Sequence, residues 1–206
     1  MLFAAPPGSG KTALARFLAY LAATVEGCAS VQAVCMDGFH FPNAYLDTHT
    51  FSEQTSTGTH SYSLRSRKGA PFTFDVLALQ AALVDAHSQN PRPWPAYSRV
   101  LHDVVSAGEP ITGDVLLIEG NYLLLDEPGW RELRHLADDT VFLTASPSLL
   151  HERLVARKIC GGSSREEAEK WYQSNDGKNV ELVLTHRLPA NIELELHEDG
   201  KISYVR

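Results

Sequence analysis

Runs of apolar residues alternate along the chain with segments of mixed polarity, and this alternation predicts strands and helices in turn. Four short runs are almost wholly apolar: Leu2–Ala4, Val31–Met36, Val115–Ile118 and Thr140–Thr144. Such runs are typical of parallel strands that are covered on both faces. Residues 14–21 instead repeat apolar side chains at i, i+3, i+4 and i+7, which predicts a crossover helix. The pattern indicates an α/β fold with a mainly parallel central sheet.

Local signals in the rest of the chain predict two further helices and a terminal hairpin. One helix is expected over residues 74–88 and another over residues 146–158. The second begins with Ser146 as N-cap and Pro147 at the first helical position. Alternating polarity around a turn predicts a β-hairpin at about residues 191–205.

A glycine pair and a capping signal suggest a movable part. Gly161-Gly162 ends the helix that begins at Ser146, and the spacing of Ser163 and Glu166 predicts a capping box for the next helix. Helices that flank a glycine hinge are typical of a mobile lid, which we expect at about residues 146–175.

Two segments carry no clear periodicity. Residues 43–70 are polar and rich in Thr, Ser, His and Tyr, which predicts a long loop. The proline-rich segment Pro91–Arg99 cannot form regular helix, because each proline removes a backbone donor, so we expect a rigid loop there.

Composition narrows the class of protein. A chain of 206 residues without a linker-like stretch predicts a single domain, 1–206. The formal net charge of −7 argues against a nucleic-acid or anionic-membrane binder and favours small-molecule ligands. The three cysteines form no C-x-x-C pair, which indicates neither disulfides nor zinc, and no apolar run is long enough to span a bilayer. We therefore expect a cytoplasmic protein; nothing in the sequence sets its oligomeric state.

The segment Ala5–Thr12, APPGSGKT, is typical of a phosphate-binding loop. Backbone N–H groups of the turn and the following helix would hold phosphates, Lys11 would reach the outer ones, and Thr12 would bind Mg²⁺. The candidate nucleotide-binding residues are Pro7, Gly8, Ser9, Gly10, Lys11 and Thr12. Ala5 departs from the G-x-x-x-x-G-K-[ST] pattern, and the alternative is an ordinary turn before a surface lysine.

A carboxylate follows each of two apolar runs. Asp37 comes after the second run and Glu119 after the third. Ligands bind at the carboxyl ends of strands in open parallel sheets, so both side chains should face the phosphate loop. For Asp37 the alternative is an ordinary Asp-Gly turn. Glu119 would either hold Mg²⁺ through water or contact substrate.

Several cations and rings complete the candidate site. The basic cluster Arg65–Lys68 is either part of a substrate-covering segment whose cations meet a phosphorylated or acidic substrate, or a solvated charge run. Tyr97, Arg99 and His102 could bind substrate, although Arg99 could equally pair with Asp103. Arg153 and Arg157 share a helix face, either as lid cations or as favourable charges near a helix C-terminus.

The motifs PPGSGKT, MDGFH, RKGAPFTFD, PAYSRVLHD and VLLIEGNYLLLDEPGW together resemble the P-loop kinases of the uridine kinase, phosphoribulokinase and pantothenate kinase group. The resemblance covers nearly the whole chain and is closest to the fructose-transport-system kinase-like branch. It implies a three-layer P-loop NTPase fold with a helical lid and the use of ATP. It also implies transfer of the γ-phosphoryl group to a hydroxyl of a nucleoside, sugar or pantothenate-like alcohol, without naming the acceptor.

The resemblance also implies roles for single residues. Asp37 matches the carboxylate that accepts the hydroxyl proton, and Arg157 matches a lid arginine that acts with Lys11 on phosphate charge. Thr12 and Glu119 would organise Mg²⁺. The substrate-side candidates are His40, Arg67, Lys68, Tyr97 and Arg99, and Asn179 or Arg187 could contact the base. The alternatives are an ATPase or nucleotide switch that acts on a protein partner, and a degenerate nucleotide-binding subunit.

Overall fold

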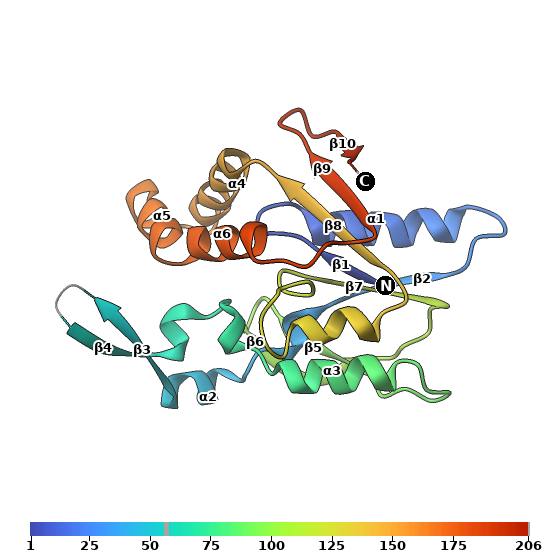
Figure 1. Ribbon diagram of the computed structural model, residues 1–206, viewed down its shortest axis with the longest axis horizontal. Helices are drawn as coiled ribbons and strands as arrows, with labels where there is room; N and C mark the ends of the chain where they lie inside the picture. Colours follow the sequence, from blue (N-terminus) through green and yellow to red (C-terminus); the bar gives the residue numbers. More distant parts are fainter. Residues whose placement is uncertain (56–57, 206) are drawn as a thin grey trace.

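The computed structural model describes residues 1–55 and 58–205, which build an α/β fold around a six-stranded sheet (Figure 1). The strand order is β10-β9-β8-β1-β7-β2. These strands are β1 (Leu2–Ala4), β2 (Val31–Cys35), β7 (Val115–Gly120), β8 (Thr140–Ala145), β9 (Ile192–Leu196) and β10 (Ile202–Tyr204). Within this sheet β10 runs antiparallel to β9, forming the predicted terminal hairpin, and the other strands run parallel. The predicted fold class is confirmed.

Helices cover both faces of this sheet (Figure 1). The helices are α1 (Lys11–Thr24), α2 (Asn43–Thr48), α3 (Val76–Asp85), α4 (Pro147–Cys160), α5 (Arg165–Trp171) and α6 (Gly177–Thr185). Helices α1, α3, α4 and α6 supply buried side chains to the clusters that pack on the sheet, whereas α2 and α5 lie farther out. Successive strand residues point to opposite faces. Leu2 and Ala4 of β1 accordingly pack in a buried cluster with α3, whereas Phe3 packs in a second cluster with α1 and α4. The alternation along one short strand thus joins the three layers.

The first strand lies in the middle of the sheet although it has three residues. Leu2 pairs with Ile118 of β7 on one side and with Thr140 of β8 on the other. The second predicted strand, β2, was expected to be buried on both faces, but it is only partly buried. Since β2 is an edge strand that pairs with β7 alone, Val34 is buried and the other side chains of β2 are half-buried.

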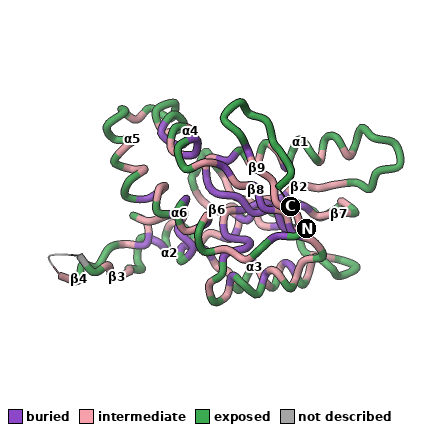
Figure 2. Tube along the Cα trace, turned by 45° about the horizontal axis from the view of Figure 1, so that its top comes forward, coloured by how far each residue is buried: buried purple, intermediate pink, exposed green. Residues whose placement is uncertain are grey.

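The expectation of a long loop over residues 43–70 was wrong. Helix α2 is followed by a hairpin of β3 (Thr50–Thr55) and β4 (Gly58–Ser63), and residues 56 and 57 lie outside the described part. The hairpin extends away from the sheet, and each of its side chains whose burial is described is half-buried or exposed (Figure 2). Because neither of its faces is covered, it lacks the apolar alternation that marks a strand in sequence.

The proline-rich segment predicted as a rigid loop also forms a hairpin, from β5 (Trp94–Ser98) and β6 (Asp103–Glu109). The pairing register shifts between Trp94 and Ala96, around a proline that has no N–H to donate. The buried Trp94 indole donates to the carbonyl of Cys35 at 2.9 Å. This contact holds the hairpin against the end of β2.

The capping box of α5 lies one residue later than predicted. Ser164 Oγ accepts the N–H of Glu167, and the Glu167 carboxylate accepts the N–H of Ser164 at 2.8 Å. The box expected at Ser163 and Glu166 does not form, because the N–H of Ser163 donates to the carbonyl of Lys158. Ser163 therefore closes the turn that follows α4.

The apolar stripe predicted on α1 is partly exposed to solvent. Ala15 is buried, but Phe17 is 54% exposed, and the far end of α1 projects beyond the sheet (Figure 2). Within residues 1–55 and 58–205, no helix is both long and apolar enough to cross a membrane.

Candidate functional site

A cleft of about 920 Å³ brings the predicted site residues together. It lies where ligands bind in open parallel sheets, at the ends of β1, β2 and β7, and helices α4 to α6 form its opposite wall. The predicted residues that line it are Pro7, Gly8, Gly10, Lys11, Thr12, Asp37, His40, Lys68, Tyr97, Arg99, Glu119 and Arg157. Ser9 is buried within the loop, and Arg67 contacts the cleft through Asn175.

The phosphate-loop segment has the backbone that anion binding requires. Gly8 and Gly10 have φ angles of 86° and 85°, a conformation that side chains disfavour. Gly10 is the N-cap of α1, and the first backbone bond of this helix runs from Leu14 N to Gly10 O. The N–H groups of the first helical turn therefore remain for an anion, at the positive end of the helix dipole.

The alanine that departs from the motif does not strain the loop. Ala5 is fully buried, and the residues of positive φ in this loop are Gly8 and Gly10. Its N–H donates to the carbonyl of Gly120 at 3.2 Å. A glycine is therefore not needed at this position.

Ala5→Gly is expected to lower the free energy of unfolding by about 1 to 2 kcal/mol, because it removes a buried methyl group and adds backbone freedom to the unfolded chain. Nucleotide affinity should stay unchanged. Denaturant unfolding and a nucleotide titration measure the two effects. A marked loss of affinity would show that the methyl group shapes the loop.

A carboxylate and a hydroxyl meet beneath the loop. Thr12 Oγ1 donates to Glu119 Oε1 at 2.7 Å, while Glu119 Oε2 is buried and has no partner among the described residues. The neighbouring Cys35 thiol has a pKa raised by its own burial and by the charges of Asp37 and Glu119. This pair of oxygen donors fits Mg²⁺, which takes few protein ligands besides phosphate oxygens and water. No cluster of three or more acidic, His or Cys side chains suited to a metal occurs in the described residues.

Asp37 lies in the 3₁₀ turn Met36–Phe39, directly after β2. A Cβ on Gly38 would lie 2.0 Å from the carbonyl oxygen of Pro95, so only glycine lets the β5–β6 hairpin approach this turn. The Asp37 carbonyl is 3.0 Å from His40 Nδ1. Backbone contacts on both sides therefore fix the main chain of Asp37, whose residue lines the cleft.

Aromatic rings surround His40. Its ring lies 3.7 Å from that of Phe74 and 5.3 Å from that of Tyr97, measured between centroids. Burial lowers the pKa of His40 and so favours the neutral imidazole. The charge of Asp37 acts in the opposite direction but is the smaller effect. Burial also raises the pKa of Tyr97. This part of the cleft offers neutral hydrogen-bonding groups on an aromatic floor.

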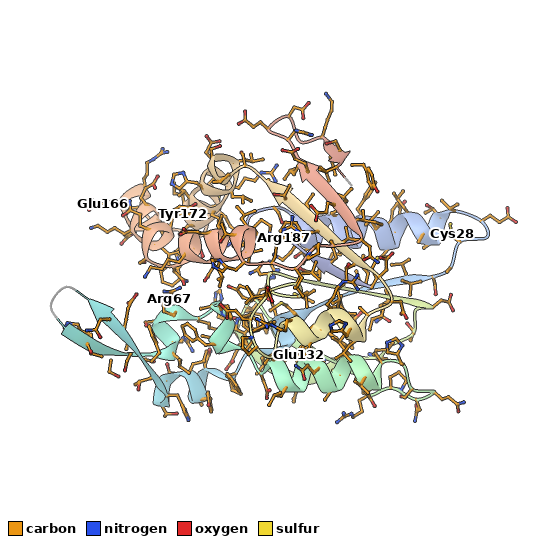
Figure 3. The ribbon with its side chains drawn as sticks, in the orientation of Figure 1. Cys28, Arg67, Glu132, Glu166, Tyr172 and Arg187 are labelled. Atoms are coloured by element: carbon orange, nitrogen blue, oxygen red, sulfur yellow. The ribbon has the colours of Figure 1, made fainter. Side chains whose placement is uncertain are left out.

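Two of the predicted substrate-side cations are already engaged. Lys68 Nζ donates to Asn43 Oδ1 and to the carbonyl of His102, each at 2.6 Å. His102 has a φ of 51°, unusual outside glycine, in the turn of the β5–β6 hairpin. Arg67 is the last residue of the 3₁₀ turn Leu64–Arg67 and faces the α5–α6 helices (Figure 3). Its Nε donates at 3.1 Å to Oδ1 of Asn175, which lies between those two helices. Both cations hold elements together at the edge of the cleft.

The two cleft arginines of α4 reach different partners. Arg153 Nη1 lies 3.5 Å from the carbonyl of Ser9, over the phosphate loop. Arg157 lies near Asp176. Burial raises the pKa of the Asp176 carboxyl overall, although the positive charge of Arg157 opposes this rise. Both arginines line the cleft, and they approach it at different points.

Sequence reasoning placed Arg65 only within the basic cluster and missed other lining residues, namely Asn121, Trp171, Asn175 and Asp176. Arg65 belongs to the basic cluster, and Asn121 comes two residues after Glu119, so both had a signal in the sequence. Asn175 and Asp176 lie in a π-helical turn, Tyr172–Asp176, between α5 and α6. No capping or periodic signal marks such a turn.

The two residues suggested for base contact separate in the structure. Asn179 is buried and lines the cleft. Arg187 is absent from the described lining: it forms a paired contact with Glu193, at 3.0 Å for each nitrogen, and stacks over Phe142 (Figure 3). Arg187 therefore packs against strands β8 and β9 of the sheet.

Comparison with known proteins places the chain in a family. It is 40% identical over 200 residues to the "Uncharacterized protein YggC" of Escherichia coli K12, covering 97% of this chain and 78% of that protein. It is 27% identical to the "Putative uridine kinase C227.14" of Schizosaccharomyces pombe, covering 92% and 79%. No protein-family model matches the chain.

A solved structure agrees with these relatives. The crystal structure of a "putative fructose transport system kinase" from Silicibacter sp. TM1040 superposes with a TM-score of 0.81 at 32% identity, covering 93% of this chain and 87% of that one. The YFH7 kinase structure from Saccharomyces cerevisiae shares the fold, with a TM-score of 0.71 at 16% identity. The chain therefore belongs to the P-loop kinases, the ATP-dependent kinases built on this fold.

Proposed function

We propose that the protein transfers the γ-phosphoryl group of ATP to a hydroxyl group of a small molecule: a nucleoside, a sugar or a pantothenate-like alcohol. The observation that carries the proposal is the position of Asp37, which lines the same cleft as the phosphate loop. A hydroxyl acceptor needs a base at that point, whereas hydrolysis of ATP by water alone would not require the cleft to extend past Asp37 to His40, Tyr97 and Arg99.

Each part of the proposed reaction has a candidate group. The main chain of residues 7–12 would hold the phosphates, with Lys11 and Arg157 neutralising charge. Thr12 and Glu119 would hold Mg²⁺, which supplies charge neutralisation on the phosphate oxygens. The Asp37 carboxylate would receive the proton of the acceptor hydroxyl. Preorganised charges of this kind are the main protein contribution to phosphoryl transfer.

A second function, an ATPase or switch that acts on a protein partner, would use the same phosphate loop. A panel of nucleosides, sugars, sugar phosphates and pantothenate-like alcohols with Mg-ATP distinguishes the two, with ADP release as the readout. Release above the rate without acceptor supports the kinase. Release that no acceptor changes supports the ATPase.

Arg157→Ala is expected to reduce turnover far more than ATP affinity, because its charge is needed chiefly in the transition state. Arg153→Ala should be milder for turnover, and its position over the loop carbonyl predicts that part of its effect falls on ATP affinity. Steady-state kinetics and nucleotide titration of both variants test this. Loss of affinity without loss of turnover in Arg157→Ala would contradict the role.

A further inference from the structure

The acceptor side of the cleft contains a guanidinium group with an unused donor. Arg65 lies in the 3₁₀ turn Leu64–Arg67 and lines the cleft. Its Nη1 atom is buried and has no hydrogen-bond partner among the described residues. An ion pair at 4.0 Å joins this Nη1 atom to a carboxylate oxygen of Asp47, but the separation is beyond hydrogen-bond distance, so the N–H donor itself stays unused.

A second guanidinium group faces the same space. Arg99 is exposed and lines the cleft, and no hydrogen bond or ion pair ties its side chain within the described part of the chain. The expected alternative, a pair with Asp103, is not observed: the Asp103 carboxylate accepts the N–H groups of Asn43 and Val104 instead. Arg65 and Arg99 both lie close enough to the Tyr97 hydroxyl for their charges to oppose the rise in its pKa.

The remaining cations of the basic cluster are not available in the same way. Lys68 donates to two oxygens, and Arg67 donates to Asn175. On the acceptor side, Arg65 therefore keeps an unused N–H donor beside its ion pair with Asp47, and Arg99 has neither a hydrogen bond nor an ion pair among the described residues. Asn121, just after β7 on the same cleft, adds a buried polar atom, Oδ1, that has no hydrogen-bond partner within the described part of the chain.

These unused groups specify a ligand. Guanidinium groups bind carboxylate and phosphate oxygens through paired hydrogen bonds, and an amide oxygen accepts from a hydroxyl. A neutral acceptor would leave both arginines facing water or each other. An acceptor with an anionic group would satisfy them.

We propose that the acceptor is a polyhydroxy compound that already carries an oxyanion, either a phosphate monoester or a carboxylate, which Arg65 and Arg99 bind. This inference rests on the proposed function, because the anion would hold the acceptor with its reacting hydroxyl beside Asp37. Arg65 and Arg99 then determine specificity and take no part in proton transfer.

The test measures binding in the absence of turnover. The full chain is saturated with Mg²⁺ and a nonhydrolysable ATP analogue, so that the phosphate loop is filled. Ribose 5-phosphate, gluconate and ribose are then titrated by calorimetry into wild type, Arg65→Met and Arg99→Met. Arg92→Met is the matched control, because Arg92 is exposed, pairs with Asp85 and lies outside the described lining of the cleft. Thermal unfolding checks that each variant is folded.

At least one of the two anionic compounds should bind more tightly than ribose to the wild type, and whichever does so identifies the anion. Each cleft variant should lose about 10- to 100-fold in affinity for that compound, the range for a hydrogen bond to a charged group. Arg92→Met should retain the preference. Equal binding of all three compounds, undetectable binding of both anions at millimolar concentration, or a preference that survives in both cleft variants would overturn the inference.

The acceptor panel with Mg-ATP separates this inference from the proposed function. Anion binding without acceptor-stimulated ADP release by any compound would reject the kinase and leave the anion site standing. Stimulation by neutral acceptors alone would keep the kinase and reject the anion site.

Discussion

Asp37→Asn is expected to leave ATP binding intact while phosphoryl transfer to the acceptor falls by about 10²- to 10⁴-fold, the usual contribution of a positioned base. The amide keeps the shape of the carboxylate and removes its basicity. The surrounding turn should survive, because its contacts to Asp37 are made by the backbone. A loose transition state needs the base late, so the loss could lie at the lower end of the range.

Two measurements distinguish a base from a metal ligand. The Mg²⁺ requirement of Asp37→Asn should equal that of the wild type. Glu119→Gln should shift it, because Glu119 is hydrogen-bonded to Thr12 and the two residues form the proposed Mg²⁺ site. Single-turnover transfer at saturating ATP reports on the chemical step. Near-normal transfer in Asp37→Asn would return Asp37 to the role of a turn residue beside Gly38.

Lys11→Ala is expected to abolish most of the thermal stabilisation by Mg-ATP. A ligand at 100 times its Kd stabilises the folded state by about 2.7 kcal/mol, so a loss of affinity appears directly as a smaller rise in melting temperature. Lys11 is the first residue of α1 and lines the cleft, where its ammonium group can reach phosphates held by the loop. Turnover should fall with affinity, because the same charge acts on the transition state.

Lys201→Ala is a suitable control for this variant. Lys201 lies in the terminal hairpin turn, its side chain is 83% exposed, and it pairs with Asp199. Its removal should leave the response to Mg-ATP unchanged. An equal rise in melting temperature for Lys11→Ala and the wild type would reject the loop as the nucleotide site.

The features that the sequence predicted well depend on short stretches of chain. The phosphate loop, the carboxylates at the strand ends and the N-cap Ser146 follow from residues that are adjacent or one helical turn apart. A buried parallel strand needs an apolar side chain at nearly every position, so β1, β7 and β8 could be found as uninterrupted apolar runs in the sequence. The capping box failed by one residue because two overlapping serine–glutamate pairs satisfy the same spacing.

Only the tertiary structure decided what the polar segments do. The strands of the β3–β4 and β5–β6 hairpins have mostly half-buried or exposed side chains. Their sequences therefore lack the apolar alternation by which a strand is recognised. The partners of the cations are distant in sequence: Arg67 bonds to Asn175, 108 positions away, and no local pattern encodes such a contact. The sequence by itself determined the parallel strands and the backbone of the phosphate-loop segment, because apolar runs and glycine turns are local features. Which cations stay free to meet a substrate was decided by long-range packing, because a charge is available only where folding brings it no partner.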